Sequence, residues 1–122
     1  MPDSLQDFSG TPVLVYAPDG PPLRNENDAL DVIGESGYRG ATWVAVPVER
    51  FTDEFFRLRT RVAGDIVQKF ANYGMGLAVI GDISRHLDAS SALRDFVRES
   101  NRGARLWFLP DADALRSRLA RS

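Results

Sequence analysis

The sequence predicts an α/β fold in one small domain, with about four to five mostly parallel strands in a mixed sheet and about four helices. Apolar runs of strand length alternate along the chain with segments in which apolar residues recur at helical spacing. The runs at 41–46 and 77–80 are almost continuously apolar, which is typical of parallel strands that are covered on both faces. The 122 residues contain no repeat and no linker, so we expect a single domain over 1–122.

The N-terminal part of the chain is expected to contribute one strand. Residues 1–10 are polar and predict an irregular N-terminal segment, whereas the β-rich run 13–17 predicts the first strand. The proline-rich cluster 18–22 should break that strand, because proline has no N–H to donate to a neighbouring strand. We expect this strand to pair as a hairpin with residues 23–24.

Residues that favour helix N-termini mark the expected starts of the helices, namely Asn25, Thr52 or Asp53, Ser90 and Asp111. The second helix is the longest, and we expect it to run without interruption for about 20 residues, or about 30 Å, until glycine ends it at position 74. Strands are expected between the helices at 41–46, 77–81 and 105–109, with a polar loop at 82–88.

The composition excludes several classes of site and partner. The formal net charge is −2 and the two signs are interleaved, so we expect no nucleic acid partner. There is no cysteine and only one histidine, which argues against a zinc site, and no metal or cofactor is expected. The chain lacks a signal-peptide pattern, and its apolar runs are too short to span a bilayer, so we expect a cytoplasmic protein without membrane contact.

One arginine lies within the apolar side of the long predicted helix. Stepping 100° per residue places Arg59 between Phe55, Ala63 and Ile66. A guanidinium stays charged and needs an acceptor when it is buried, and helical side chains lean toward the N-terminus of their helix. We therefore predict that Arg59 points at Asp82, just past the strand 77–81, or at a carbonyl nearby. A purely structural ion pair, or an arginine that reaches out to solvent, remains the alternative.

The carboxyl edge of the predicted sheet is the first candidate site. Open α/β sheets bind ligands at this edge, and helix N-termini with basic residues there could hold an anion. The candidate residues are Arg59, Asp82, Thr52, Arg85 and His86. An ordinary solvated loop is the alternative.

The opposite edge of the sheet is the second place where polar residues gather. Its members are Gln68, Lys69, Asn72, Glu99, Asn101 and Arg102. A pair between Lys69 and Glu99 is expected, and Asn101 is expected to satisfy carbonyls at a helix end or to adopt a left-handed conformation. Helix capping and packing between two helix ends would explain the same residues without any function.

Several segments of the chain match a known family pattern: Asp53–Thr60, Ala63–Phe70, Asn72–Tyr73, Ala78–Asp82 and Glu99–Gly103. Together they resemble the bacterial family named domain of unknown function 4180, over about residues 25–119. The family usually has glycine where Arg61 stands and glutamate where Asp65 stands. The order of elements also resembles the STAS fold of anti-sigma-factor antagonists, but this chain lacks their phosphorylated Asp-Ser-Ser-Gly turn. Thr52 is the only hydroxyl there.

Two functions are compatible with the sequence. The first is a non-catalytic regulatory or protein-interaction module of STAS-like build, acting on an unknown protein partner or through self-association. The second is a protein or enzyme that binds a small anion in a carboxyl-edge pocket around Arg59 and Asp82. The chain has no P-loop, no Gly-x-Ser-x-Gly elbow and no His-Glu-x-x-His motif, which favours a function other than catalysis.

Overall fold

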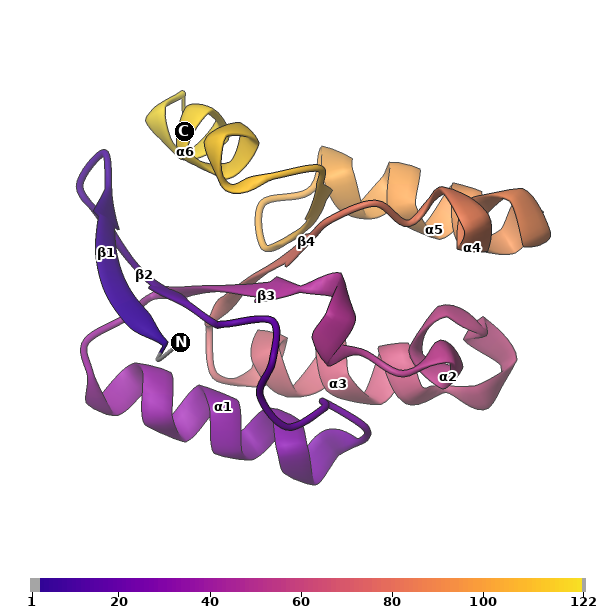
Figure 1. Cartoon of the computed structure of the whole chain (residues 1–122), viewed down its shortest axis with the longest axis horizontal. Coiled ribbons are helices and arrows are strands. Elements are labelled where there is room, and N and C mark those ends of the chain that lie inside the picture. The colour runs from indigo at the N-terminus through magenta and orange to yellow at the C-terminus, as the bar shows by residue number, and fades with distance from the viewer. Residues whose placement is uncertain (1–2, 122) are drawn as a thin grey trace.

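Five strands form one mixed sheet in which their spatial order equals their order along the chain. The computed structural model describes residues 3–121 and is shown in Figure 1. The first strand is antiparallel to the second, and the remaining neighbours are parallel, as the sequence predicts. The strands are β1 (Ser4–Phe8), β2 (Thr11–Val15), β3 (Trp43–Pro47), β4 (Gly76–Ile80) and β5 (Leu106–Leu109).

Three of the expected N-caps are confirmed. The side chains of Asn25, Ser90 and Asp111 each accept a hydrogen bond from the backbone N–H three residues later. Thr52 occupies the N-cap position of the helix that begins at Asp53, as expected, but its side chain makes no such bond. The helices are α1 (Glu26–Tyr38), α2 (Asp53–Phe56), α3 (Val62–Asn72), α4 (Ser84–Ala89), α5 (Ser91–Arg102) and α6 (Ala112–Ala120), with 3₁₀ turns η1 (Val48–Arg50) and η2 (Leu58–Thr60).

The two faces of the sheet are covered unequally. Because parallel strands follow one another in order, right-handed crossovers place α1, α3 and α5 on the same face. Alternate strand residues such as Val44, Leu77 and Phe108 pack under these helices in the larger core. The other face has a smaller core around Ala45, Ala78 and Trp107, which α6 covers with Leu115 and Leu119. Figure 1 shows α6 across the strands from α1 and α3.

The N-terminal segment is not irregular, contrary to the expectation for 1–10. Residues 4–8 form β1, and the first two residues of that segment lie outside the described part of the chain. Ser9 and Gly10 have φ angles of 54° and 90°, so both central residues of the turn are left-handed, which suits a tight hairpin. Leu23 does not pair with β2 as expected, but forms a parallel bridge with Phe51.

The long helix expected after residue 52 is interrupted. It is divided into α2, η2 and α3, and Arg61 at the break has a φ of 67°. The hydroxyl of Thr60 bonds to the carbonyls of Glu54 and Arg57 at 2.7 and 2.8 Å, which replaces helical bonds that the break removes. The left-handed backbone at Arg61 explains why glycine suits this position.

The remaining departure is the expected polar loop at 82–88. Residues 84–89 form the short helix α4, whose first N–H is bonded to Asp82 at 2.9 Å. This helix and the divided long helix explain why there are more helices than expected. No helix within residues 3–121 has the length and apolar character needed to cross a membrane.

Candidate functional site

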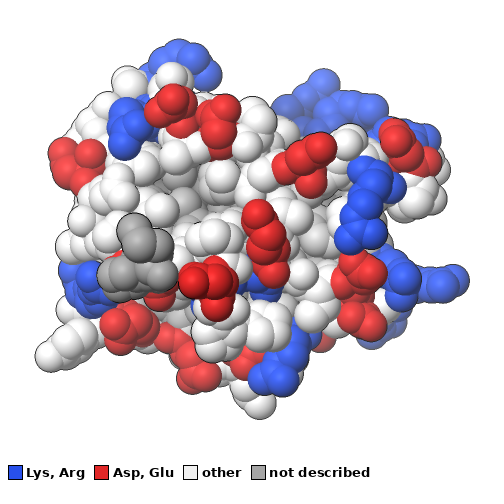
Figure 2. All heavy atoms as spheres, in the orientation of Figure 1, with Lys and Arg blue, Asp and Glu red and all other residues white. Residues whose placement is uncertain are grey.

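A cleft of about 580 Å³ lies at the carboxyl edge of the sheet, between the α2–η2 segment and the α4–α5 segment. Because α2 follows β3 and α4 follows β4, the cleft occupies the edge at which open α/β sheets bind ligands. We call it the basic cleft and define it by its charged and ring-bearing lining residues, which are Asp53, Phe56, Arg57, Arg59, Arg85 and His86. Figure 2 shows Lys and Arg side chains near the end of the molecule where α2, α4 and α5 lie.

The break in the long helix brings two arginines to the cleft. Arg57 is the residue after α2 and Arg59 lies in η2, and both side chains are exposed. In a continuous helix Arg59 would lie on the buried side, but the 3₁₀ turn removes it from that side. Within residues 3–121, neither arginine has a hydrogen bond or an ion pair from its guanidinium. These groups are therefore available to an anion.

Arg85 and Asp53 connect the two walls of the cleft. Nη2 of Arg85 on α4 lies 3.1 Å from Oδ1 of Asp53 on α2. Both side chains are largely exposed, so the pair contributes only about 0–1 kcal/mol to stability. The pair nevertheless holds α4 beside α2 and fixes the position of one positive charge.

The imidazole ring of His86 packs against an aromatic side chain in the basic cleft. Its imidazole stacks on Phe56 with a centroid distance of 4.1 Å and an interplanar angle of 11°. Burial lowers the pKa of His86, and the charge of neighbouring Arg85 lowers it further. His86 is therefore mostly neutral at pH 7, and the positive charge of the cleft comes from its arginines.

The structure brings together three of the five residues predicted for this edge. Arg59, Arg85 and His86 line the basic cleft, whereas Thr52 and Asp82 do not. The predicted pair between Arg59 and Asp82 is not formed. Asp82 is exposed and accepts hydrogen bonds from the N–H and the hydroxyl of Ser84 at 2.9 and 2.6 Å, which lower the pKa of its carboxyl. This carboxylate caps α4.

The second predicted cluster does not form a site. Nε2 of Gln68 donates to Asn72 at 2.8 Å within α3, and Glu99 pairs with Arg102 at 3.6 Å within α5. The expected pair between Lys69 and Glu99 is absent among the described residues. Both of these contacts join residues of one helix that are about one turn apart, and neither connects α3 with α5.

Asn101 in that cluster has a role that the sequence did not indicate. Its amide accepts from the N–H of Phe108 at 2.7 Å and donates to the carbonyl of Phe108 at 3.2 Å. β5 is an edge strand, and its Arg105 and Leu109 carbonyls bond toward β4. The peptide groups of Phe108 therefore face outward, and Asn101 pairs with them as a neighbouring strand would.

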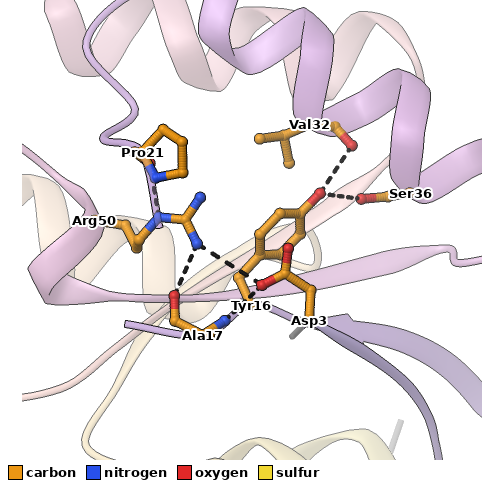
Figure 3. Close-up of polar contacts among 7 residues, drawn as sticks. All are labelled: Asp3, Tyr16, Ala17, Pro21, Val32, Ser36 and Arg50. Atoms are coloured by element: carbon orange, nitrogen blue, oxygen red, sulfur yellow. Dashed lines mark hydrogen bonds and ion pairs between the residues drawn. The ribbon is translucent and has the colours of Figure 1, made fainter. Parts of the chain in front are cut away.

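A buried arginine was missed by the sequence reasoning. Arg50 follows β3 and is 5% exposed. As Figure 3 shows, its Nε donates to the carbonyl of Pro21 at 2.7 Å and its Nη1 donates to that of Ala17 at 2.8 Å. Its guanidinium also lies over the ring of Tyr16 and 3.9 Å from Asp3. The one available signal was the proline-rich loop, whose carbonyls need donors that a strand cannot provide.

The lining of the basic cleft is rich in groups that bind anions. Within residues 3–121, no group of three or more His, Asp or Glu side chains is placed to hold a metal ion. The residues that line the basic cleft bring three guanidinium groups together with the carboxylate of Asp53, the imidazole of His86, the hydroxyl of Ser90 and apolar or aromatic carbon. Such a set binds and orients an anion by hydrogen bonds and charge.

Comparison with known proteins gives one match. Searches of curated proteins and of solved structures find no similar protein. Residues 8–119 match the family described as "Domain of unknown function (DUF4180)", in agreement with the resemblance found in the sequence. Since this match covers most of the length of the chain, the protein belongs to the DUF4180 family.

Proposed function

We propose that this domain is a binding module that takes a small anionic ligand in the basic cleft. The observation that carries the proposal is the pair of exposed arginines, Arg57 and Arg59, which have no ion-pair partner among residues 3–121 and line a concave surface. With Arg85 they give three guanidinium groups against the single carboxylate of Asp53. Like charges on one concave surface repel each other, and an anion bound there would relieve that repulsion.

The lining of the cleft favours a particular class of anion. Guanidinium groups match the planar geometry of carboxylates and the oxygens of phosphates. Phe56, Leu58 and the small residues Ala89 and Ala92 add apolar surface beside the charges. A volume of about 580 Å³ falls in the range of small-molecule sites. The ligand class that fits is an organic phosphate or carboxylate with an apolar or aromatic part.

A regulatory role of STAS-like build is the second part of the proposal. It is supported by the sequential sheet order, the antiparallel first strand and the crossover helices on one face. In this view the domain is cytoplasmic and non-catalytic, and the ligand would change its affinity for a partner protein or for a second copy. Thr52 remains the only hydroxyl in the turn between β3 and α2 at which a covalent switch could act.

Titration of the protein with phenyl phosphate tests the binding site. We expect saturable binding that the double variant Arg57→Ala/Arg59→Ala weakens by about tenfold or more, which is about 1.4 kcal/mol. Both positions are exposed, so the variant should fold normally. Arg39→Ala is the matched control, because it removes an exposed arginine far from the cleft and should leave the affinity unchanged. Equal binding by wild type and the double variant would refute the proposal.

A further inference from the structure

We propose that a second hollow at the carboxyl edge binds a free α-amino acid with an apolar side chain. This hollow has a volume of about 220 Å³ and lies between α1 and the loop that follows β2. We call it the Arg50 pocket and define it by Tyr16, Pro21, Leu23, Val32, Glu35 and Arg50. It shares no lining residue with the basic cleft, so the inference is independent of the function proposed above.

Arg50 has one donor group left to offer. Its Nε and Nη1 are occupied by the carbonyls of Pro21 and Ala17, but Nη2 has no hydrogen-bond partner within residues 3–121. Figure 3 shows this third nitrogen on the side of the guanidinium that faces away from Ala17 and toward the region of Val32. The side chain as a whole is 5% exposed. No fully buried side-chain nitrogen or oxygen within residues 3–121 lacks a hydrogen-bond partner, so the unpartnered Nη2 is in contact with solvent. A ligand carboxylate can therefore reach this donor and form a charge-assisted hydrogen bond with it.

The guanidinium is held in place before any ligand arrives. Its plane is fixed by two carbonyls and by the ring of Tyr16, whose hydroxyl lies 3.1 Å from Ser36. A Cβ at Gly20 would lie 2.5 Å from Cζ of Arg50, so only glycine leaves room for the group there. Such preorganisation lowers the entropic cost of binding.

The opposite wall of the pocket carries negative charge. Asp31 and Glu35 lie one turn apart on α1, both are exposed, and both line the pocket. Neither has a cationic partner among the described residues, and like charges at this spacing destabilise a helix. The neighbouring Asp28 is already occupied, because it accepts from Nε and the backbone N–H of Arg24 at 3.1 and 2.9 Å. A ligand ammonium would be attracted to Asp31 and Glu35.

These two walls together select a zwitterion. A ligand carboxylate would bind Nη2 of Arg50 while an ammonium on the same molecule lies near Asp31 and Glu35. A simple carboxylate would be repelled by those two acids, and a simple amine would leave Nη2 without an acceptor. Pro21, Leu23 and Val32 form the apolar part of the lining, which suits an aliphatic side chain. The volume exceeds the roughly 150 Å³ of a cavity that holds benzene, so a medium-sized side chain fits.

Three matched probes test this selection. L-Leucine carries both charges, 3-methylbutylamine has the same carbon skeleton without the carboxylate, and 4-methylpentanoate lacks the ammonium. Each is titrated at millimolar concentration into ¹⁵N-labelled protein while backbone amide signals are followed. We expect leucine to shift the backbone amide signals of Tyr16, Leu23 and Val32. The affinity of each single-charge probe should be lower than that of leucine by about tenfold or more.

Variants then test which side chains of the pocket bind the ammonium and the carboxylate of the ligand. Asp31→Asn/Glu35→Gln should weaken leucine binding by about tenfold or more, whereas Glu26→Gln, a neighbouring acid of α1 outside the pocket, should leave it unchanged. Arg50→Lys should abolish binding, and because it could also disturb folding the Asp31/Glu35 variant is the decisive arm. Absence of leucine-induced shifts at the pocket would overturn the proposal. Equal affinity for 4-methylpentanoate, or insensitivity to the Asp31/Glu35 change, would also overturn it.

Discussion

Arg50 and Arg59 lie beside neighbouring hollows at the same edge of the sheet, yet one is almost wholly buried and the other is exposed to solvent. Arg50 comes from the turn after β3 and is held by two backbone carbonyls and a tyrosine ring. Arg59 comes from η2 and has no partner within residues 3–121. The first guanidinium is part of the folded structure, whereas the second is a free charge on its surface.

The difference shows what allows an arginine to be buried. Helical spacing predicted burial for Arg59, because its neighbours at that spacing are apolar. Burial in fact occurs where backbone carbonyls lack other donors, as at Ala17 and Pro21 beside the proline-rich loop. A charged group is accepted in a protein interior when acceptors are already present there, and an apolar pattern around it is no substitute.

The largest expected effect separates these two arginines directly. Arg50→Ala should lower the free energy of unfolding by about 3 kcal/mol, because it leaves two carbonyls without their donor and removes packing from Tyr16. Arg59→Ala should change it by about 0.5 kcal/mol or less, as expected for an exposed residue without partners. Urea unfolding of both variants measures the difference. Similar values for the two variants would show that the contrast is wrong.

A smaller effect on stability is expected from a substitution at Gly20, which packs against the guanidinium of Arg50. Gly20→Ala places a methyl group 2.5 Å from Cζ of the guanidinium, so that Arg50 or the loop must shift. We expect a loss of about 1–3 kcal/mol in unfolding free energy. Gly64→Ala is the matched control, because nothing lies within 4 Å of its Cβ position and alanine favours the helix. Thermal melts that rank Gly64→Ala below Gly20→Ala would contradict this prediction.

The smallest expected effect concerns pH and the basic cleft. The folded protein lowers the pKa of His86, so the unfolded chain binds a proton more readily than the folded one. The contribution of His86 to stability is therefore complete above about pH 6.5 and is lost as pH falls through the folded-state pKa. The positive charges of Arg85 and Arg57 act in the same direction, and Asp53 opposes them.

Unfolding measurements between about pH 7.5 and about pH 5 should show this decline in the wild type and a flatter profile in His86→Gln. Loss of the Phe56 stack will lower the overall stability of the variant, so the slope is the informative quantity. Identical slopes would mean that His86 does not titrate differently on folding. Arg50 should add nothing to the slope of stability against pH, because arginine keeps its charge across this range.

Much of the fold follows from the sequence. The parallel strands 43–47 and 76–80 are apolar on both faces because helices cover one side and α6 the other. Asn25, Ser90 and Asp111 cap their helices, since a short acceptor side chain at that position satisfies a free N–H. These features depend on local chemistry and on hydrophobic periodicity, which a single sequence displays.

The predictions that were wrong concern features that depend on contacts between distant parts of the folded chain. Nothing in the apolar spacing of 53–73 marks the break at Arg61, which relies on the hydroxyl of Thr60 and a left-handed residue. Arg59, Arg85 and His86 were expected at the carboxyl edge of the sheet, and the structure places these three residues there together. The prediction that Arg59 pairs with Asp82 was wrong, because the break in the helix places Arg59 on the surface without a partner within residues 3–121. Arg50 was missed, since its acceptors belong to a loop far away in the sequence.

The pairing of Asn101 with Phe108 limits how copies of this domain can associate. The amide occupies the outward N–H and C=O of Phe108 in β5, so a strand from another molecule cannot pair with that residue. The opposite edge of the sheet is β1, which pairs only with β2. Growth of a fibre by sheet extension requires two accessible edges in every copy. A sheet that grew by backbone pairing at β1 alone would therefore stop at two copies.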